Sequence, residues 1–280
     1  MFRFTPVFMI IILALSCSKV KDQIIRPGDL VPGDGPSCES LVLERTMNLA
    51  AMIEQSYLTD LRFPWFSGIA HLGTELAFVI SSQDHERNVS VLFHLDLENL
   101  LIRKKQSFQE VACDLEWNGR DPLVLVGCDG NPTKLVEING EQMIELYRFE
   151  GFSYIDAFAV DLDKLQAWLY ADGSLYSLAN IVPETTPSQH QTKPYILSFF
   201  MISDITIDGG SLLVTNNAFE VGMPNLLEHF HPTYGQTECI YDIENVDGLK
   251  GTRGLKVTTD RNYVWILSAD GVLAEFQHLL

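Results

Sequence analysis

The segment LQAWLYADGSLYSLAN, residues 165–180, carries the pattern on which the fold prediction rests. An apolar run leads into Asp172-Gly173, and a second run of alternating apolar and polar residues follows. Asp-Gly between two such runs is a strong signal for a tight β-hairpin, because both residues tolerate positive φ angles. We therefore expect two antiparallel strands that are joined at Asp172 and Gly173.

The same arrangement recurs along the chain. Four further segments combine an apolar strand with a polar turn and usually a second strand, at residues 75–96, 122–140, 211–222 and 263–277. The turns, anchored at Asp84, Asp129, Asp172, Asn216 and Asp270, are 45, 43, 44 and 54 residues apart. Another strand precedes each hairpin, at 67–73, 113–118, 155–161, 203–208 and 254–260. Such a period, with several strands in each unit, is typical of propeller blades.

The sequence thus predicts an all-β protein in which residues 64–280 form a β-propeller of about five blades, or six. In period and hairpin pattern it resembles the loosely repeated propellers of secreted bacterial proteins, without a Trp-Asp pair in each blade. A β-sandwich is the structural alternative. Residues 38–63 differ from this pattern. Residues 40–58 lack Gly and Pro and place Leu43, Met47, Ala50 and Ile53 at helical spacing, which predicts one N-terminal helix.

The N-terminus has the features of an export signal. Arg3 supplies a positive charge, residues 4–15 are mostly apolar, and Ala14-Leu15-Ser16-Cys17 follows at the distance expected for cleavage. This end resembles the lipobox of bacterial lipoproteins, although Ala14 occupies the position that is usually leucine. The resemblance implies that residues 1–16 are removed and that Cys17 carries the lipid, including palmitate. Ser18, rather than aspartate, follows the cysteine, and by the same resemblance the outer membrane is the expected location.

Two features around this signal bear on how the protein is held. Ala14 and Ser16 also fit the small-x-small rule of ordinary signal peptidase, which would give a free secreted protein. Residues 18–37 contain three Pro and three Gly and have no apolar periodicity. Such a stretch does not fold alone, so we expect residues 17–37 to be a flexible tether between a membrane lipid and the domain.

Charge and motifs limit the classes of function. The net charge of −18 repels phosphate backbones, so we do not expect a nucleic-acid partner, and it attracts cations or basic proteins. The chain contains no G-x-S-x-G, H-E-x-x-H, P-loop or G-x-G-x-x-G motif. We expect a non-catalytic binding or scaffold protein of the cell envelope, with an envelope protein or a small ligand as its partner. A propeller hydrolase or lyase with acids in the channel and a structural envelope component are the alternatives.

Three acids occupy corresponding places in the strands that precede the hairpins. Alignment of these strands puts Gly68, Asp114, Asp156, Asp204 and Gly254 in one column. Because the innermost strands of a propeller line a central channel, the carboxylates of Asp114, Asp156 and Asp204 could converge and bind a cation such as calcium. The alternative is that each Asp caps its own turn by accepting hydrogen bonds from nearby backbone N–H groups.

A second candidate site contains two histidines. His229 and His231, followed by Tyr234, fall in the longest interval between hairpins, which suggests a ligand-binding loop. Alternating histidines can present both imidazoles on one side and bind zinc. The alternative is an exposed polar loop.

The cysteines suggest two disulfides. If Cys17 carries a lipid, Cys38, Cys113, Cys128 and Cys239 remain in an exported chain, where disulfides persist. Cys113 and Cys128 lie in neighbouring candidate strands, and Cys38 would then pair with Cys239. The alternative is that some of the thiols remain reduced and buried.

Overall fold

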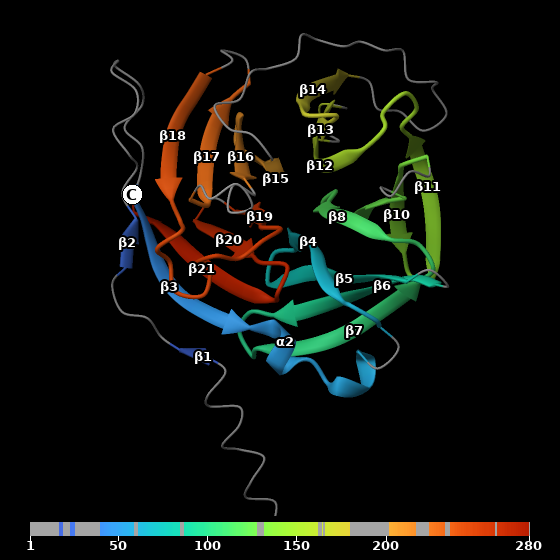
Figure 1. Cartoon of the computed structure of the whole chain (residues 1–280), viewed down its shortest axis with the longest axis horizontal. Coiled ribbons are helices and arrows are strands. Elements are labelled where there is room, and N and C mark those ends of the chain that lie inside the picture. Colours follow the sequence, from blue (N-terminus) through green and yellow to red (C-terminus); the bar gives the residue numbers. More distant parts are fainter. Residues whose placement is uncertain are drawn as a thin grey trace, which may run out of the picture.

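Five antiparallel sheets surround a central channel, like the blades of a propeller (Figure 1). The computed structural model describes residues 17–18, 23–25, 40–58, 61–84, 87–127, 132–161, 164, 166–179, 202–216, 224–232, 236–260 and 262–279. The predicted all-β propeller with five blades is therefore confirmed, and the sandwich is wrong.

The first four blades follow one another along the chain. Blade 1 consists of β4 (Trp65–His71), β5 (Glu75–Asp84), β6 (Arg87–Asp96) and β7 (Leu101–Phe108). Blade 2 consists of β8 (Ala112–Trp117), β9 (Pro122–Val126), β10 (Lys134–Asn139) and β11 (Gln142–Arg148). Blade 3 contains β12 (Ile155–Asp161), β13 (Gln166–Ala171) and β14 (Ser174–Ala179). Blade 4 consists of β15 (Ile202–Asp208), β16 (Ser211–Asn216), β17 (Leu226–His231) and β18 (Gln236–Asp242).

The Asp-Gly turn between β13 and β14 forms as predicted. Ala171 pairs with Ser174, and Asp172 and Gly173 between them have φ angles of 49° and 76°. Two consecutive positive φ angles match the right-handed twist of the flanking strands, which explains why Asp-Gly is favoured here.

Blade 5 combines the two ends of the chain. It contains β19 (Lys256–Thr259), β20 (Tyr263–Leu267), β21 (Val272–Leu279) and, on the outer side, β3 (Ser40–Asn48), which pairs with β21 along its whole length. The helix predicted over residues 40–58 is therefore wrong for its first half. Only α2 (Leu49–Met52) and η2 (Gln55–Tyr57) are helical, and Asn48 caps α2 by accepting a hydrogen bond from the Ala51 N–H.

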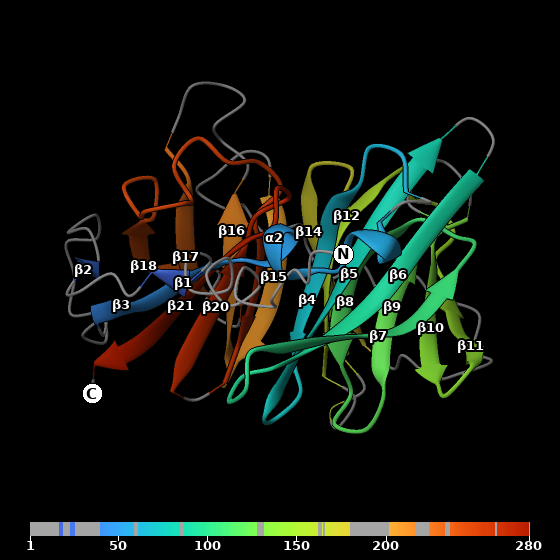
Figure 2. The ribbon, with the colours of Figure 1, turned by 90° about the horizontal axis from the view of Figure 1, so that it is seen from below.

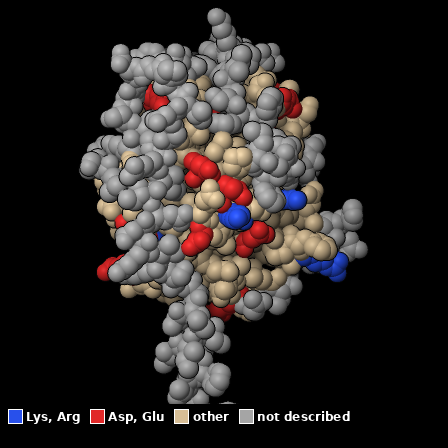
Figure 3. Space-filling view, turned by 60° about the vertical axis from the view of Figure 1, so that its left-hand side comes forward, with Lys and Arg blue, Asp and Glu red and all other residues tan. Residues whose placement is uncertain are grey.

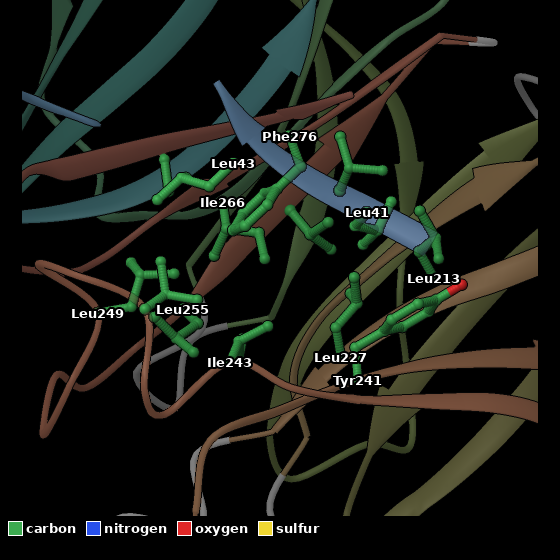
Figure 4. Packing of buried hydrophobic residues seen from close by; sticks show 14 of the residues in the cluster. Leu41, Leu43, Leu213, Leu227, Tyr241, Ile243, Leu249, Leu255, Ile266 and Phe276 are labelled. Atoms are coloured by element: carbon green, nitrogen blue, oxygen red, sulfur yellow. The ribbon is translucent and has the colours of Figure 1, made fainter. Parts of the chain in front are cut away.

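The packing of β3 explains why it is a strand. Leu41 and Leu43 alternate along β3 and are buried in one core cluster with Leu213 and Leu227 of blade 4 and Ile266 and Phe276 of blade 5 (Figure 4). Burying a side chain of this size stabilises the fold by about 1.5–3 kcal/mol, which outweighs the small differences in helix propensity. Tertiary pairing thus decides the conformation of this segment.

Part of the predicted tether also lies on this blade. β1 (Cys17–Ser18) and β2 (Gln23–Ile25) pair with β3, with Cys17 opposite Met47 and Ile24 opposite Val42. The backbone at Cys17 is therefore at the outer edge of blade 5, away from the channel (Figure 1). The rest of residues 17–37 lies outside the described residues.

The innermost strands β4, β8, β12, β15 and β19 contact one another and close the ring. Figure 2 shows this ring from the side, with the strands running between the two ends of the channel. β4 and β8 approach closely at Gly68, where an added Cβ atom would lie 2.6 Å from the Leu115 backbone nitrogen. Glycine is needed there because any side chain would push blades 1 and 2 apart. Among the described residues, no helix is long and apolar enough to cross a membrane.

Candidate functional site

The centre of the channel is closed by a buried cluster of three charged residues. Lys256 Nζ lies 3.4 Å from Asp114 Oδ1 and 3.5 Å from Asp204 Oδ1, and it donates a hydrogen bond to the Ser203 carbonyl oxygen at 3.1 Å. Asp114 and Asp204 are each 1% exposed and Lys256 is 6% exposed. The cation that the two acids face is thus a lysine of the same chain.

The same carboxylates join neighbouring blades. Asp114 Oδ2 accepts a hydrogen bond from the Phe158 N–H of blade 3, and Asp204 Oδ2 accepts one from the Val257 N–H of blade 5, at 3.0 and 2.6 Å. Asp114 Oδ1 also accepts from the N–H of Leu115. These two acids lie together in the channel, but they do not cap their own turns as the alternative requires: apart from the Leu115 N–H, the backbone groups that they bond belong to other blades.

The sequence alignment that put Gly68, Asp114, Asp156, Asp204 and Gly254 in equivalent positions is wrong for Asp156 and Gly254. A β-bulge follows the first residue of β8, β12 and β15 and the second residue of β4 in their pairing with the next strand, and Asp114 and Asp204 come directly after it. Asp156 lies within the bulge of β12, so Ala157 takes the corresponding place in blade 3. In blade 5 that place belongs to Lys256 and not to Gly254, because Val257 bonds Asp204 as Phe158 bonds Asp114.

Charge coupling keeps Lys256 protonated. Burial lowers the pKa of a lysine, but the charges of Asp114 and Asp204 outweigh it and raise the pKa of Lys256. Burial raises the pKa of Asp114, and Lys256 opposes that change. Burial and the charge of Asp114 raise the pKa of Asp204 well above its ordinary value. An ammonium group held in this way is a cation and not a nucleophile.

A cavity of about 500 Å³ opens above this cluster, at the end of the channel where the innermost strands begin. We call this end the upper mouth. Residues from all five blades line it, including Trp65, Gln83, Tyr154, Asp156, Tyr170 and Lys256. Its volume is in the range of pockets that hold small molecules.

Asp156 is the carboxylate of the upper mouth. Its side chain is half-buried, and within the described part of the chain it makes no hydrogen bond or close ion pair. Burial raises the pKa of Asp156 to about 6, with Lys256 lowering and Asp172 raising it. The third predicted acid therefore lies in the channel, as expected, but apart from Asp114 and Asp204.

Aromatic residues, among them Trp65, Tyr154 and Tyr170, line the cavity with Asp156. Tyr154 is 51% exposed, and its backbone N–H and that of Ser153 donate to the carboxylate of Asp172, which fixes this segment at the mouth.

The opposite end, which we call the lower mouth, has a cavity of about 360 Å³. Glu116 lines it, and burial followed by the charge of Asp114 raises the pKa of Glu116 well above its ordinary value, although Thr206 donates a hydrogen bond to it. The His71 N–H donates to Thr258 Oγ1, and the His71 ring stacks on Trp265 with 4.7 Å between the ring centres. Glu116 and His71 thus each have a partner at this end of the channel.

The prediction that His229 and His231 lie in a loop is wrong. His229 and His231 lie in strand β17, and Tyr234 lies outside the described residues. His229 is placed between two acids, with Nδ1 3.0 Å from Glu238 Oε2 and Nε2 3.4 Å from Asp208 Oδ2. The regular blade pattern continues through this segment because Phe230 of the same strand packs in the core between blades 3 and 4.

No group of three or more His, Cys, Asp or Glu side chains in the described part of the chain is arranged to hold a metal ion. This applies to the predicted calcium set, Asp114, Asp156 and Asp204, and to His229 with His231. In the channel, Lys256 occupies the place that the calcium hypothesis assigns to a metal.

The disulfides stay predictions. Cys113 lines the upper mouth, and Cys239 lies in the core cluster that contains Leu41. Their predicted partners, Cys128 and Cys38, lie outside the described residues.

Sequence reasoning missed Lys256 and Glu116. Lys256 is the basic residue of the segment GLKVTTD, and an alignment on the residue after the bulge in the other blades would have placed it opposite the acids. Glu116 follows Asp114 by two residues, so its side chain is on the same side of β8, which period-2 spacing could have indicated.

No family model matches the chain, and no curated protein matches it. Among solved structures, it is similar to the Pan2 WD40 domain of Neurospora crassa, with 6% sequence identity and a TM-score of 0.42. That similarity covers 86% of this chain and 72% of the other.

Proposed function

We propose that the protein is an exported, lipid-anchored propeller that binds a ligand or partner at the upper mouth without catalysing a reaction. The observation that carries the binding site is Asp156, a half-buried carboxylate with no hydrogen-bond partner among the described residues, in a cavity to which all five blades contribute. Buried polar groups are normally satisfied, and a group that the protein leaves unsatisfied is a candidate for contact with a ligand.

The N-terminal sequence supports the anchor. Residues 1–16 have the pattern of an export signal, and Ala14-Leu15-Ser16-Cys17 resembles a lipobox. In the fold, Cys17 pairs with Met47 at the outer edge of blade 5. A lipid on Cys17 would leave from that edge and would keep both mouths accessible, with the outer membrane of a bacterium as the proposed location.

Substitution of the cysteine tests the anchor. In a Cys17→Ala variant, we expect the protein to leave the detergent-soluble membrane fraction and to be recovered as a soluble exported protein. The intact mass of the native protein should exceed that of the mature polypeptide by the mass of the acyl groups. If the variant still fractionates with membranes, or if the native protein has the mass of the bare polypeptide, lipidation at Cys17 is wrong.

A propeller hydrolase or lyase is the second candidate function. It is favoured by Asp156, because a carboxyl group with a pKa of about 6 is suited to general acid–base catalysis near neutral pH. The described residues of the upper mouth supply no activated nucleophile beside it, since the charge pair with Asp114 and Asp204 keeps Lys256 protonated. Activity that depends on Asp156 and follows a pH profile with an inflection near 6 would favour this candidate over simple binding.

A further inference from the structure

At the upper mouth, the positive charge has oppositely charged neighbours at close range and the negative charge does not. Asp156 and Lys256 are the charged side chains among the described residues that line the cavity. Lys256 already faces two carboxylates within 3.5 Å, so an anion entering the cavity would meet a cation whose charge is matched. The charged groups that face Asp156 are Lys256 and Asp172, and neither is within ion-pair distance of it. The uncompensated charge of the cavity is therefore negative.

A ligand with positive charge would relieve the cost of burying this carboxylate. A half-buried carboxylate without hydrogen bonds has lost part of its hydration and gained nothing in exchange. A cation at Asp156 replaces that hydration, whereas a neutral ligand would bury the carboxylate further without compensation. The protein as a whole, with a net charge of −18, also attracts cations over long distances. Acidic side chains outnumber basic ones in the view of Figure 3.

The walls of the cavity favour an organic cation over a metal ion. Trp65, Tyr154 and Tyr170 line the cavity with Asp156. Aromatic faces attract ammonium and guanidinium groups and also contact the apolar body of a ligand. The described residues offer no set of three metal-ligating side chains here. A cavity of about 500 Å³ also has more room than an ion needs.

We infer that the ligand of the upper mouth carries an organic cation, a primary ammonium or guanidinium group, which sits on Asp156 while its body lies against Trp65 and Tyr154. This inference rests on the proposed binding function and adds the ligand's chemical class. The cation could belong to a free amine or to a lysine or arginine side chain of a peptide, since both present the same group to the carboxylate.

Three matched probes separate charge from shape. Tyramine carries an ammonium group on a phenol ring, 4-ethylphenol is its neutral counterpart, and 4-hydroxyphenylacetate carries a negative charge instead. Binding of each is measured by isothermal titration calorimetry and by thermal shift on the full chain in detergent at neutral pH. We expect tyramine to bind about tenfold more tightly than the neutral probe, and the anion not to bind. N-acetyl-lysinamide and acetyl-Gly-Lys-Gly-amide, compared with tyramine, distinguish a peptide side chain from a free amine.

Two variants localise the effect. Asp156→Asn should weaken tyramine binding about tenfold and remove its preference over 4-ethylphenol. Glu116→Gln, which neutralises the acid of the lower mouth, should leave binding unchanged. Tyramine keeps its charge well above neutral pH, so its affinity should fall as the pH is lowered through about 6 and Asp156 becomes protonated.

The outcomes also separate this inference from the proposed function. If 4-ethylphenol or 4-hydroxyphenylacetate binds as tightly as tyramine at the upper mouth, the cation class is wrong and the binding site stands. If none of the cationic probes binds, or if Asp156→Asn binds tyramine as well as the native protein, the inference is overturned. The lipid anchor is unaffected by either result, because fractionation of the Cys17→Ala variant tests it separately.

Discussion

Each mouth of the channel contains an acidic residue, but the two acids differ in their hydrogen-bond partners. At the lower mouth, Glu116 is bonded by Thr206, and His71 is held by Thr258 and Trp265. At the upper mouth, Asp156 has no such partner among the described residues and shares the cavity with Trp65 and the exposed Tyr154. Both mouths have a cavity and an acid with a raised pKa. What distinguishes the upper mouth as a binding site is that the protein leaves its carboxylate unsatisfied.

The charged cluster between the mouths makes them separate sites, and its removal should have the largest effect. Lys256→Met would leave Asp114 and Asp204 buried without their cation. Breaking a buried ion pair from one side costs about 3–5 kcal/mol, so we expect a loss of that size in the free energy of unfolding, measured by urea denaturation at neutral pH.

A matched triple variant controls for the loss of the lysine side chain itself. Adding Asp114→Asn and Asp204→Asn to Lys256→Met should recover much of the stability, because asparagine oxygens can still accept the bonds from Phe158 and Val257. A Lys256→Met variant within about 1 kcal/mol of the native protein would contradict the buried cluster.

The pH dependence of stability sharpens the comparison of the two acids. A carboxyl group whose pKa is raised by folding stabilises the fold below its unfolded pKa, and that contribution is lost as the pH rises through the folded pKa. For Asp156 the loss falls between about pH 3.8 and 6, and it is complete above that range. For Glu116, whose pKa is raised well above 4.5, the loss begins only near pH 4.5 and continues above it.

Neutral variants of these acids should therefore gain stability at different pH values. Without ligand, Asp156→Asn should exceed the native protein by about 1 kcal/mol above pH 6, after allowance for solvent screening, and should match it near pH 4. The gain of Asp156→Asn should begin near pH 3.8, and that of Glu116→Gln only near pH 4.5. Urea denaturation across this pH range measures both differences. Two gains that rise and level off together would show that the two mouths do not differ in this respect.

The local features of the fold could be predicted from the sequence, and the long-range ones could not. The hairpin at Asp172-Gly173 depends on neighbouring residues alone, and it forms as predicted. The segment 40–48 has apolar residues that fit a helix, but it forms a strand because it pairs with β21, more than 200 residues later in the sequence. Arg45 and Glu275 form an ion pair between these two strands. A pattern within one segment cannot reveal a partner so distant in the sequence.

The candidate site was predicted in part for a related reason. Asp114 and Asp204 were placed correctly because both follow a bulge in equivalent strands. In β12 the aspartate lies inside the bulge, one residue before the place that Asp114 and Asp204 occupy in their strands, and the pairing of β19 with β20 contains no bulge. An alignment by sequence alone therefore selected Asp156 and Gly254 in place of Ala157 and Lys256. The calcium hypothesis followed from that error, because the acids were known and the cation that faces them was not.

The central claim is that the upper mouth, and not the lower one, binds the ligand. The four tryptophans report on separate places: Trp65 lines the upper mouth, Trp117 the lower mouth and Trp168 a groove at blades 3 and 4, while Trp265 is buried. Fluorine NMR of the protein labelled with 5-fluorotryptophan, titrated with tyramine, reads all four positions at once. We predict that the Trp65 resonance shifts with saturation, that the other three stay in place, and that Asp156→Asn abolishes the shift. A shift of Trp117 with Trp65 unmoved would contradict the account.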